Sequence, residues 1–376
     1  MMTETAEQYY RIPDWGVGYL RVAENGQVVL HPTKEEDIQV GLRTLVDDLA
    51  RRGHRAPLHL HFPQVIDYSV RKLVRSFQRA CSEFEYGGTY TPVYPVKVNQ
   101  LAPVVQTILD AGRDAGIGLE AGSKAELAAV LSRIPATGRI VCNGYKDAQY
   151  VELACKAART IPNTTLVIEK YSELDILFDT IQQLKPDFLP RIGIRARLHT
   201  RGTGKWEESG GDFARFGLTA AELLAAVGAI RDEGLLDQLH MLHVHIGSQI
   251  THTVNVKRMV QEAGMLYAEL VKAGYPIRTI DFGGGLGVDY DGSRSPGDSS
   301  INYTMTEYAN NIVFHLKDIC KQKQVPEPNL MTESGRAMVA HHALVVVDAF
   351  EQHSLFSPMP VINTDFSTAK VLFDLK

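Results

Sequence analysis

Lys97 is the residue with the clearest chemical use, because a single amine stands near the end of an apolar, β-prone run from Tyr90 to Val98. Alternate side chains of a strand share a face, so Lys97 would point the same way as Val93 and Pro95. Two interpretations are open. The lysine reaches solvent at the strand terminus, or its amine forms a Schiff base with a carbonyl cofactor. The other polar motifs decide between them.

A glycine-rich stretch, Gly283-Gly284-Gly285-Leu286-Gly287, follows another apolar run. Consecutive glycines let a backbone approach an anion closely and turn its N–H groups toward it. The stretch is not a dinucleotide fingerprint, because that motif would need a glycine where Tyr290 stands and a helix directly afterwards. A tight turn without a ligand is the simpler alternative. We favour a phosphate-binding loop outside a nucleotide-binding fold.

Two histidines, His243 and His245, lie two residues apart and would share one face of a strand. Such a pair is commonly packed core or a metal pair, but no nearby Cys, Asp or Glu in the sequence completes a metal set. An imidazole can also lie against a planar ring. Ser248, which follows Gly247, is well placed to donate a hydrogen bond to a phosphate.

Glu333 and Arg336 lie three residues apart near the last β-prone run. As an exposed ion pair they would contribute under ~1 kcal/mol. Alternatively, Glu333 pairs with a protonated ring nitrogen and Arg336 with a phosphate. An amine for an aldehyde, an anion loop, an imidazole for a ring, a carboxylate for a pyridinium and a guanidinium for a phosphate together describe a site for pyridoxal phosphate (PLP).

Eight β-prone runs alternate with helical patterns from about residue 88 onward, which is the repeat number of a (β/α)8 barrel of about 250 residues. A doubly wound open sheet is the alternative. We favour the barrel because a polar residue ends every run, and the C-terminal ends of barrel strands converge on one site. These residues are Lys97, Glu120, Asn143, Glu169, Arg195, His243 with His245, Asp281 and Glu333. Before the barrel, the sequence predicts a hairpin over 14–33 and helices over 35–55 and 66–82.

The composition is that of an ordinary globular protein: 44% of the 376 residues are hydrophobic, 22% are charged and the formal net charge is −5. This charge gives no reason to expect a nucleic-acid partner. Four cysteines without CxxC spacing argue against a disulfide framework and a zinc site, and they fit a reducing cytosol. The sequence shows neither a signal-peptide pattern nor an apolar run of about 20 residues, so we expect no membrane partner.

Several stretches resemble the biosynthetic arginine decarboxylases, which are PLP-dependent enzymes of fold type III and belong to the second class of ornithine, lysine and arginine decarboxylases. The stretches are residues 94–100, 118–127, 141–147, 215–217, 243–249, 281–290 and 333–337. The resemblance implies an α/β fold, with a PLP-binding (β/α)8 TIM barrel and part of an accessory β domain. The expected division is an N-terminal segment with a hairpin and a helix (1–60), the barrel (61–345) and the start of a C-terminal β domain (346–376).

The resemblance also implies roles for individual residues. Lys97 is the Schiff-base lysine, His245 stacks on the cofactor ring and Glu333 pairs with the pyridine nitrogen, and these three are the expected catalytic residues. The expected phosphate contacts are Ser248, Gly284, Gly285 and Arg336. The expected substrate contacts form one loop: Asp281, Phe282, Gly283, Gly284, Gly285, Leu286, Gly287, Val288, Asp289, Tyr290 and Asp291.

The activity that the resemblance implies is decarboxylation of L-arginine to agmatine and CO2, a step toward putrescine and spermidine in polyamine biosynthesis. It also implies a cytoplasmic homo-oligomer and magnesium as a second cofactor, whose site the sequence does not identify. Family members are longer than this chain, so we expect a truncated C-terminal domain, weak PLP binding and little activity alone. The alternatives are decarboxylation of diaminopimelate, ornithine or lysine, and a non-catalytic homologue that regulates an active subunit.

Overall fold

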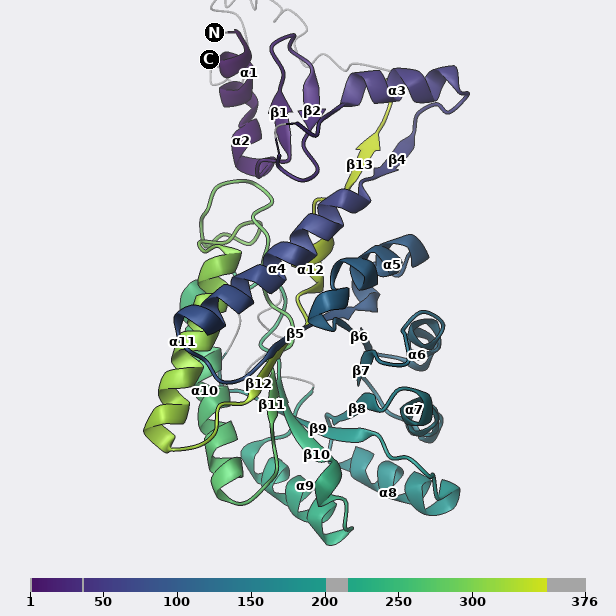
Figure 1. Cartoon of the computed structure of the whole chain (residues 1–376), viewed down its shortest axis with the longest axis vertical. Coiled ribbons are helices and arrows are strands. Elements are labelled where there is room, and N and C mark those ends of the chain that lie inside the picture. Colours follow the sequence, from purple (N-terminus) through teal and green to yellow (C-terminus); the bar gives the residue numbers. More distant parts are fainter. Residues whose placement is uncertain (1, 36, 201–215, 350–376) are drawn as a thin grey trace, which may run out of the picture.

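A closed barrel of eight parallel strands forms the centre of the protein, which confirms the predicted barrel over the open sheet. The computed structural model describes residues 2–35, 37–200 and 216–349. The strands are β5 (Tyr90–Pro95), β6 (Gly118–Ala121), β7 (Arg139–Cys142), β8 (Asn163–Ile168), β9 (Arg191–Ala196), β10 (Leu239–Val244), β11 (Thr279–Asp281) and β12 (Asn329–Thr332). They neighbour one another in sequence order, and the barrel closes where β12 pairs with β5 (Figure 1).

Helices cover the outside of the barrel, because each connection between two parallel strands crosses back over the sheet. They are α5 (Ala102–Ala111), α6 (Lys124–Leu131), α7 (Ala148–Thr160), α8 (Ser172–Leu184), α9 (Ala220–Asp232), α10 (Thr253–Lys272) and α11 (Met305–Lys323). A separate buried cluster comes from five strands: Val93, Val141, Val167, Met241 and Met331. Within the described residues, no helix combines the length and the apolar character needed to cross a membrane.

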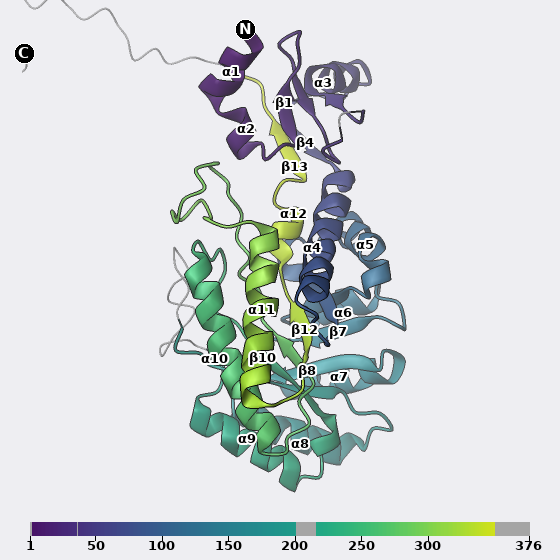
Figure 2. The ribbon, with the colours of Figure 1, turned by 60° about the vertical axis from the view of Figure 1, so that its left-hand side comes forward.

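The N-terminal residues form a small layer beyond one end of the barrel (Figures 1 and 2). Its elements are α1 (Met2–Tyr10), α2 (Ile12–Trp15), β1 (Leu20–Val22), β2 (Val28–Leu30), β3 (Val40–Gly41) and α3 (Leu42–Arg51). The antiparallel pair β1–β2 confirms the predicted hairpin. The helix predicted over 35–55 is too long, since Val40 pairs with Leu30 in the sheet and the helix begins only at Leu42.

A two-stranded antiparallel sheet connects this layer to the barrel. β4 (Leu58–His61) leads into α4 (Pro63–Glu83), which confirms the helix predicted over 66–82 and packs against α5 and α11. β13 (Ala343–Val346) pairs with β4 and follows the short α12 (Gly335–Val339) after the last barrel strand. The segments before and after the barrel therefore meet beside its mouth. The domain boundaries expected near 60 and 345 fall in these two strands and stay predictions.

β5 ends before Lys97, so the strand expected over residues 90–98 is too long. Pro95 cannot donate a ladder hydrogen bond, and Val96–Val98 forms a single 3₁₀ turn. Gly335, the first residue of α12, packs against this turn: a Cβ there would lie 2.8 Å from Pro95 Cγ. The lysine therefore stands on a tight turn between the barrel and α12.

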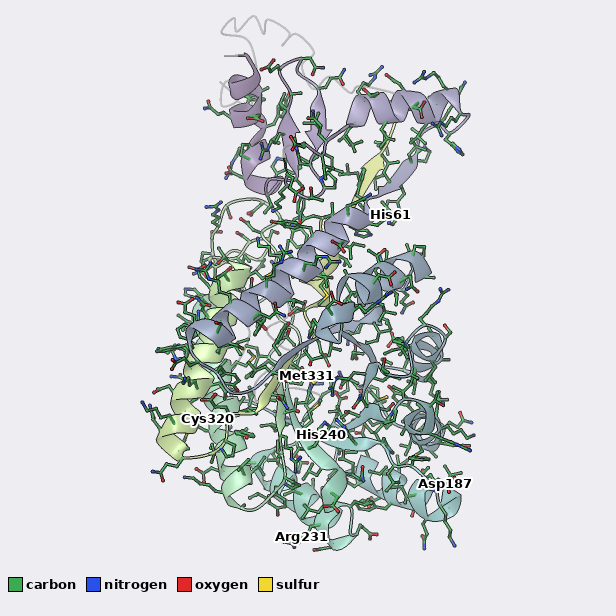
Figure 3. All side chains as sticks on the ribbon, in the orientation of Figure 1. His61, Asp187, Arg231, His240, Cys320 and Met331 are labelled. Atoms are coloured by element: carbon green, nitrogen blue, oxygen red, sulfur yellow. The ribbon has the colours of Figure 1, made fainter. Side chains whose placement is uncertain are left out.

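His240, labelled in Figure 3, lies near the start of β10, at the end of the barrel opposite to Lys97. Burial lowers the pKa of this imidazole to about 3, and Arg191 and Arg139 act in the same direction. Below pH 6.5 the unfolded chain binds a proton that the folded chain excludes, so the free energy of unfolding falls as the pH drops. We expect this histidine alone to lower the free energy of unfolding by roughly 2 kcal/mol between pH 7 and pH 5.

Denaturant titrations across that pH range check this expectation. His240→Gln should show a shallower loss of stability with falling pH than the wild type, because glutamine does not titrate. His54→Gln is the matched control, since His54 is exposed, and it should keep the wild-type pH dependence. Identical slopes for His240→Gln and the wild type would contradict the expectation.

Candidate active site

A cavity of about 490 Å³ opens at the C-terminal mouth of the barrel, beside α12. Its wall is formed by the turn after β5 and by the segments that follow β10, β11 and β12. The seven residues that the sequence predicts as cofactor contacts all line it: Lys97, His245, Ser248, Gly284, Gly285, Glu333 and Arg336. The structure thus brings together side chains that are far apart in the sequence.

Lys97 is paired with a buried carboxylate. Its Nζ donates to both oxygens of Glu120, each 3.1 Å away, and Glu120 of β6 has no exposed surface. The Lys97 side chain itself is 53% exposed. Burial lowers the pKa of Lys97, but Glu120 and then Glu333 outweigh burial, so the pKa lies above its ordinary value. Burial raises the pKa of Glu120. The amine therefore has a proton acceptor directly beside it.

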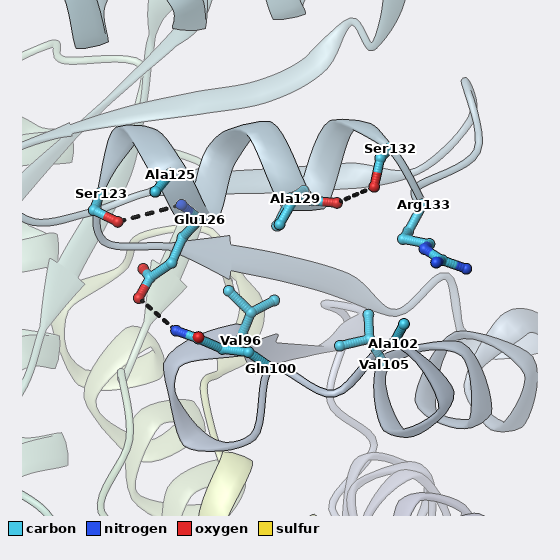
Figure 4. A pocket seen from close by; sticks show the side chains of 11 residues that line it. Val96, Gln100, Ala102, Val105, Ser123, Ala125, Glu126, Ala129, Ser132 and Arg133 are labelled. Carbon is cyan, nitrogen blue, oxygen red and sulfur yellow. Dashed lines mark hydrogen bonds between the residues drawn. The ribbon is translucent and has the colours of Figure 1, made fainter.

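Helix α6 is hydrogen-bonded to the segment that follows Lys97. Ser123 caps this helix by accepting a hydrogen bond from the Glu126 N–H at 3.3 Å. The Glu126 carboxylate accepts from Gly122 N–H at 2.6 Å and from Gln100 Nε2 at 3.4 Å (Figure 4). A second cavity, of about 380 Å³, lies beside these residues between α5 and α6. None of the predicted cofactor residues lines it, so it is not the candidate site.

Glu333 is a buried acid directly after β12. Asn143, directly after β7, donates from Nδ2 to Glu333 Oε1 at 2.8 Å. Burial raises the pKa of Glu333 well above its ordinary value, and Asp281 and Glu120 act in the same direction. A positively charged partner would stabilise the ionised form of such an acid. A protonated pyridine nitrogen is a partner of this kind, so the site fits the role expected of Glu333.

His243 faces two carboxylates that its sequence neighbourhood did not reveal. Its Nδ1 lies 3.3 Å from Asp281 Oδ2 and 3.9 Å from Glu333 Oε1. In the described part of the chain, this is the one group of three side chains close enough to share a metal ion. Mg²⁺ prefers six oxygen ligands, several of them waters, whereas this group is buried and includes an imidazole. It does not fit magnesium.

His245 lies beyond β10, beside the glycine turn. Its Nδ1 accepts from the Gly247 N–H at 2.9 Å, so the neutral ring carries its proton on Nε2. Burial lowers the pKa of His245 well below its ordinary value, and Arg195 adds to this effect. Gly284 passes close to the ring, since a Cβ there would lie 3.2 Å from Nε2. A neutral imidazole at the cavity wall fits the predicted stacking role.

Glu169 and Arg195 form a second ion pair between strand-end residues, with 2.6 Å between Oε1 and Nη1. Burial raises the pKa of Glu169, but Lys146 and Arg195 outweigh burial and the net shift is downward. Neither member of the pair lines the cavity. Their contribution to the site is the positive charge that Arg195 places near His245.

The glycine turn after β11 adopts a backbone that favours glycine. Gly283 has φ +61° and Gly285 has φ +117°, values that other residues rarely adopt. Beside the turn, Arg336 donates from Nη2 to Ser248 Oγ at 3.1 Å and from Nη1 to Tyr290 Oη at 3.0 Å. A guanidinium, a hydroxyl and glycine backbone therefore line the same cavity, and this combination suits an anion such as phosphate.

The predicted substrate loop, residues 281–291, contributes only partly to the cavity. Four of its members line the wall: Gly284, Gly285, Leu286 and Tyr290. Other residues of the loop do not line the cavity. Asp281 is buried beside His243, and Asp291 accepts a hydrogen bond from the Ser293 N–H at 2.8 Å. A substrate contact stays a prediction and is best supported for Tyr290, which is 43% exposed.

His342 is a cavity residue that no sequence motif indicated. Its Nδ1 lies 2.6 Å from Val339 O, and its Nε2 lies 3.1 Å from Nδ1 of His61 on β4 (Figure 3). A carbonyl only accepts, so His342 donates to Val339 and accepts from His61 when both rings are neutral. The available signal was the histidine-rich character of both segments, with His59 beside His61 and His341 beside His342.

Comparison with known proteins agrees with this geometry. Residues 70–340 match the family described as pyridoxal-dependent decarboxylase, pyridoxal binding domain. The chain belongs to the pyridoxal-dependent decarboxylase family. The matched residues of this decarboxylase domain include all eight barrel strands and all seven predicted cofactor residues.

Biosynthetic arginine decarboxylases are similar to this chain along most of its length, which confirms the resemblance seen in the motifs. The protein of Deinococcus radiodurans is 44% identical over 343 residues, covering 91% of this chain and 51% of the relative. That of Bacteroides thetaiotaomicron is 42% identical over 354 residues, covering 94% and 56%. The crystal structure of the Campylobacter jejuni enzyme has a TM-score of 0.82 at 35% identity, covering 97% of this chain and 58% of that one. The chain thus spans about half the length of the curated relatives it matches.

Proposed function

We propose that this chain binds PLP in the cavity at the barrel mouth and forms the pyridoxal-binding part of an enzyme that decarboxylates L-arginine to agmatine and CO2. The observation that carries the proposal is the arrangement of Lys97, Glu333 and Arg336 around one cavity. The family supports a PLP-dependent decarboxylase. The choice of arginine is supported by relatives named biosynthetic arginine decarboxylase.

Each part of the cavity has a task in this proposal. Lys97 would hold the aldehyde carbon of PLP, and Glu120, whose carboxylate lies 3.1 Å from Nζ, would accept the proton that the amine must lose. Ser248, the glycine turn and Arg336 would hold the phosphate. When bound, PLP supplies an electron sink for the electron pair that departing CO2 leaves behind. Glu333 would keep a proton on the ring nitrogen, which would strengthen that sink.

Further predictions concern the whole protein. A homo-oligomeric assembly and a cytoplasmic location are supported by resemblance. Decarboxylation of diaminopimelate, ornithine or lysine is the alternative activity, and non-catalytic regulation is the alternative role. The intact set of Lys97, Glu120 and Glu333 at one site argues for catalysis over regulation.

Release of CO2 from carboxyl-labelled amino acids tests the proposal. The chain is incubated with PLP and with arginine, ornithine, lysine or diaminopimelate in separate reactions, and Lys97→Ala gives the background. We expect release above background with arginine, measured with enzyme in amounts sufficient to detect a single turnover. Preference for another amino acid would replace arginine as the substrate. Release no higher than that of Lys97→Ala with all four would contradict decarboxylation.

A further inference from the structure

Asn143 joins two parts of the candidate site that different strands supply. It directly follows β7, and its backbone N–H donates to Ala121 O at 2.9 Å. Its side chain reaches Glu333 at 2.8 Å, although β5 and β6 lie between β7 and β12 in the barrel. The same side chain lies near Glu120 and lowers the pKa of that carboxylate. One buried amide therefore donates to the acid expected at the ring nitrogen and lies near the acid beside the lysine.

The orientation of this amide follows from its neighbours. An ionised carboxylate only accepts hydrogen bonds, so the NH2 group of Asn143 faces Glu333. The other atom, Oδ1, is buried and has no hydrogen-bond partner among the described residues. A buried acceptor without a partner destabilises the fold. Packing alone therefore does not account for an asparagine here, whereas donation to Glu333 does.

The charges around the two acids show why a neutral donor is useful. Lys97 neutralises Glu120 directly, with 3.1 Å between the charged groups. For Glu333, the nearest basic side chain among the described residues is His243, at 3.9 Å. Burial raises the pKa of Glu333, and Asp281 and Glu120 raise it further; Lys97 and, after it, the hydrogen bond from Asn143 oppose them. Asn143 thus favours an ionised Glu333 without placing a competing cation at the site.

We propose that Asn143 is a positioning residue for PLP, because it orients the Glu333 carboxylate toward the ring nitrogen. The inference rests on the proposed function, because it requires PLP in the cavity. A purely structural asparagine would affect every ligand of the cavity alike. A residue that acts through Glu333 affects only a ligand that carries the ring nitrogen.

Two probes separate these roles: PLP, and 1-deazapyridoxal 5′-phosphate, in which a C–H group replaces the ring nitrogen. Their dissociation constants are measured by absorbance titration of the wild-type chain and its variants. Asn143→Asp keeps the shape of the side chain but removes the donor, and Asn143→Ala removes the amide. Ser248→Ala is the matched control, because it acts where the phosphate is expected.

We expect the wild type to bind PLP more tightly than the deaza analogue. In the Asn143 variants the ratio of the two dissociation constants should fall by about tenfold, which is the effect expected for the loss of a hydrogen bond to a charged group. Ser248→Ala should weaken the binding of both probes equally and leave the ratio of their dissociation constants unchanged. Thermal unfolding shows whether each variant is folded. If Asn143→Ala does not fold, Asn143→Asp decides the question.

The outcomes distinguish this inference from the proposed function. If the wild type prefers PLP and the folded Asn143 variants keep the whole preference, the inference is overturned while the proposed function stands. If the wild type does not bind PLP, both are overturned. If it binds both probes equally well, Glu333 does not engage the ring nitrogen, and the inference is overturned together with that part of the proposed function.

Discussion

Lys97→Ala is expected to abolish covalent retention of PLP by the chain. Among the described residues no other lysine lines the cavity, so no second amine can take over the bond to the aldehyde carbon there. The measurement is visible absorbance after saturation with PLP and extensive dialysis. The wild type should retain the band of a lysine-linked cofactor, and the variant should lose it completely. The same variant should release no CO2 above the uncatalysed background.

Lys156→Ala provides the matched control for this experiment. Lys156 lies on the outer helix α7, is 65% exposed and pairs with Glu152 in the same helix. Removing it should leave PLP retention at the wild-type level. Retention of the absorbance band by Lys97→Ala, together with its loss in Lys156→Ala, would move the attachment point away from the barrel mouth and contradict the proposed site.

Arg336→Ala is expected to weaken PLP binding strongly while leaving pyridoxal, which has no phosphate, almost unaffected. The guanidinium lines the cavity and donates to Ser248, so it is placed to donate to the same anion as that hydroxyl. Hydrogen bonds that involve charged groups contribute about 1.5–3 kcal/mol each, which corresponds to a rise of about 10- to 150-fold in the Kd for PLP. Absorbance titrations with both compounds measure the two effects.

Arg231→Ala tests whether loss of any arginine would have the same result. Arg231 is exposed on α9, where it pairs with its neighbour Asp232 (Figure 3), and its removal should change neither affinity. An equal loss of affinity for PLP and pyridoxal in Arg336→Ala would show that Arg336 acts on the shape of the cavity. The phosphate assignment would then be wrong.

The barrel and most of the site could be predicted because their signals are local. Each strand is an apolar run that ends in a polar residue, and parallel strands in a barrel bring those ends to one mouth. Lys97, Glu333 and Arg336 could thus be assigned to a common site from their positions at strand ends. All three residues line one cavity, and their roles at a cofactor stay predictions.

The pairing between these residues could not be predicted, because it depends on distances across the barrel. The hydrogen bond from Asn143 to Glu333 spans two intervening strands. His243 on β10 contacts Asp281, which lies on β11, and Glu333, which follows β12. Sequence spacing carries no information on such contacts. The helix predicted over 35–55 was too long for a related reason, since an apolar repeat does not show that Val40 has a strand partner in Leu30.

Borohydride reduction of the PLP-treated wild-type chain, followed by peptide mapping, tests the central claim most directly. Reduction makes the bond between a lysine and the cofactor permanent, so the modified residue can be identified by mass spectrometry. We expect one stoichiometric pyridoxyl group, on the peptide that contains Lys97. A label on a different lysine, or the same scattered labelling after PLP is replaced by an aldehyde without a phosphate, would contradict it.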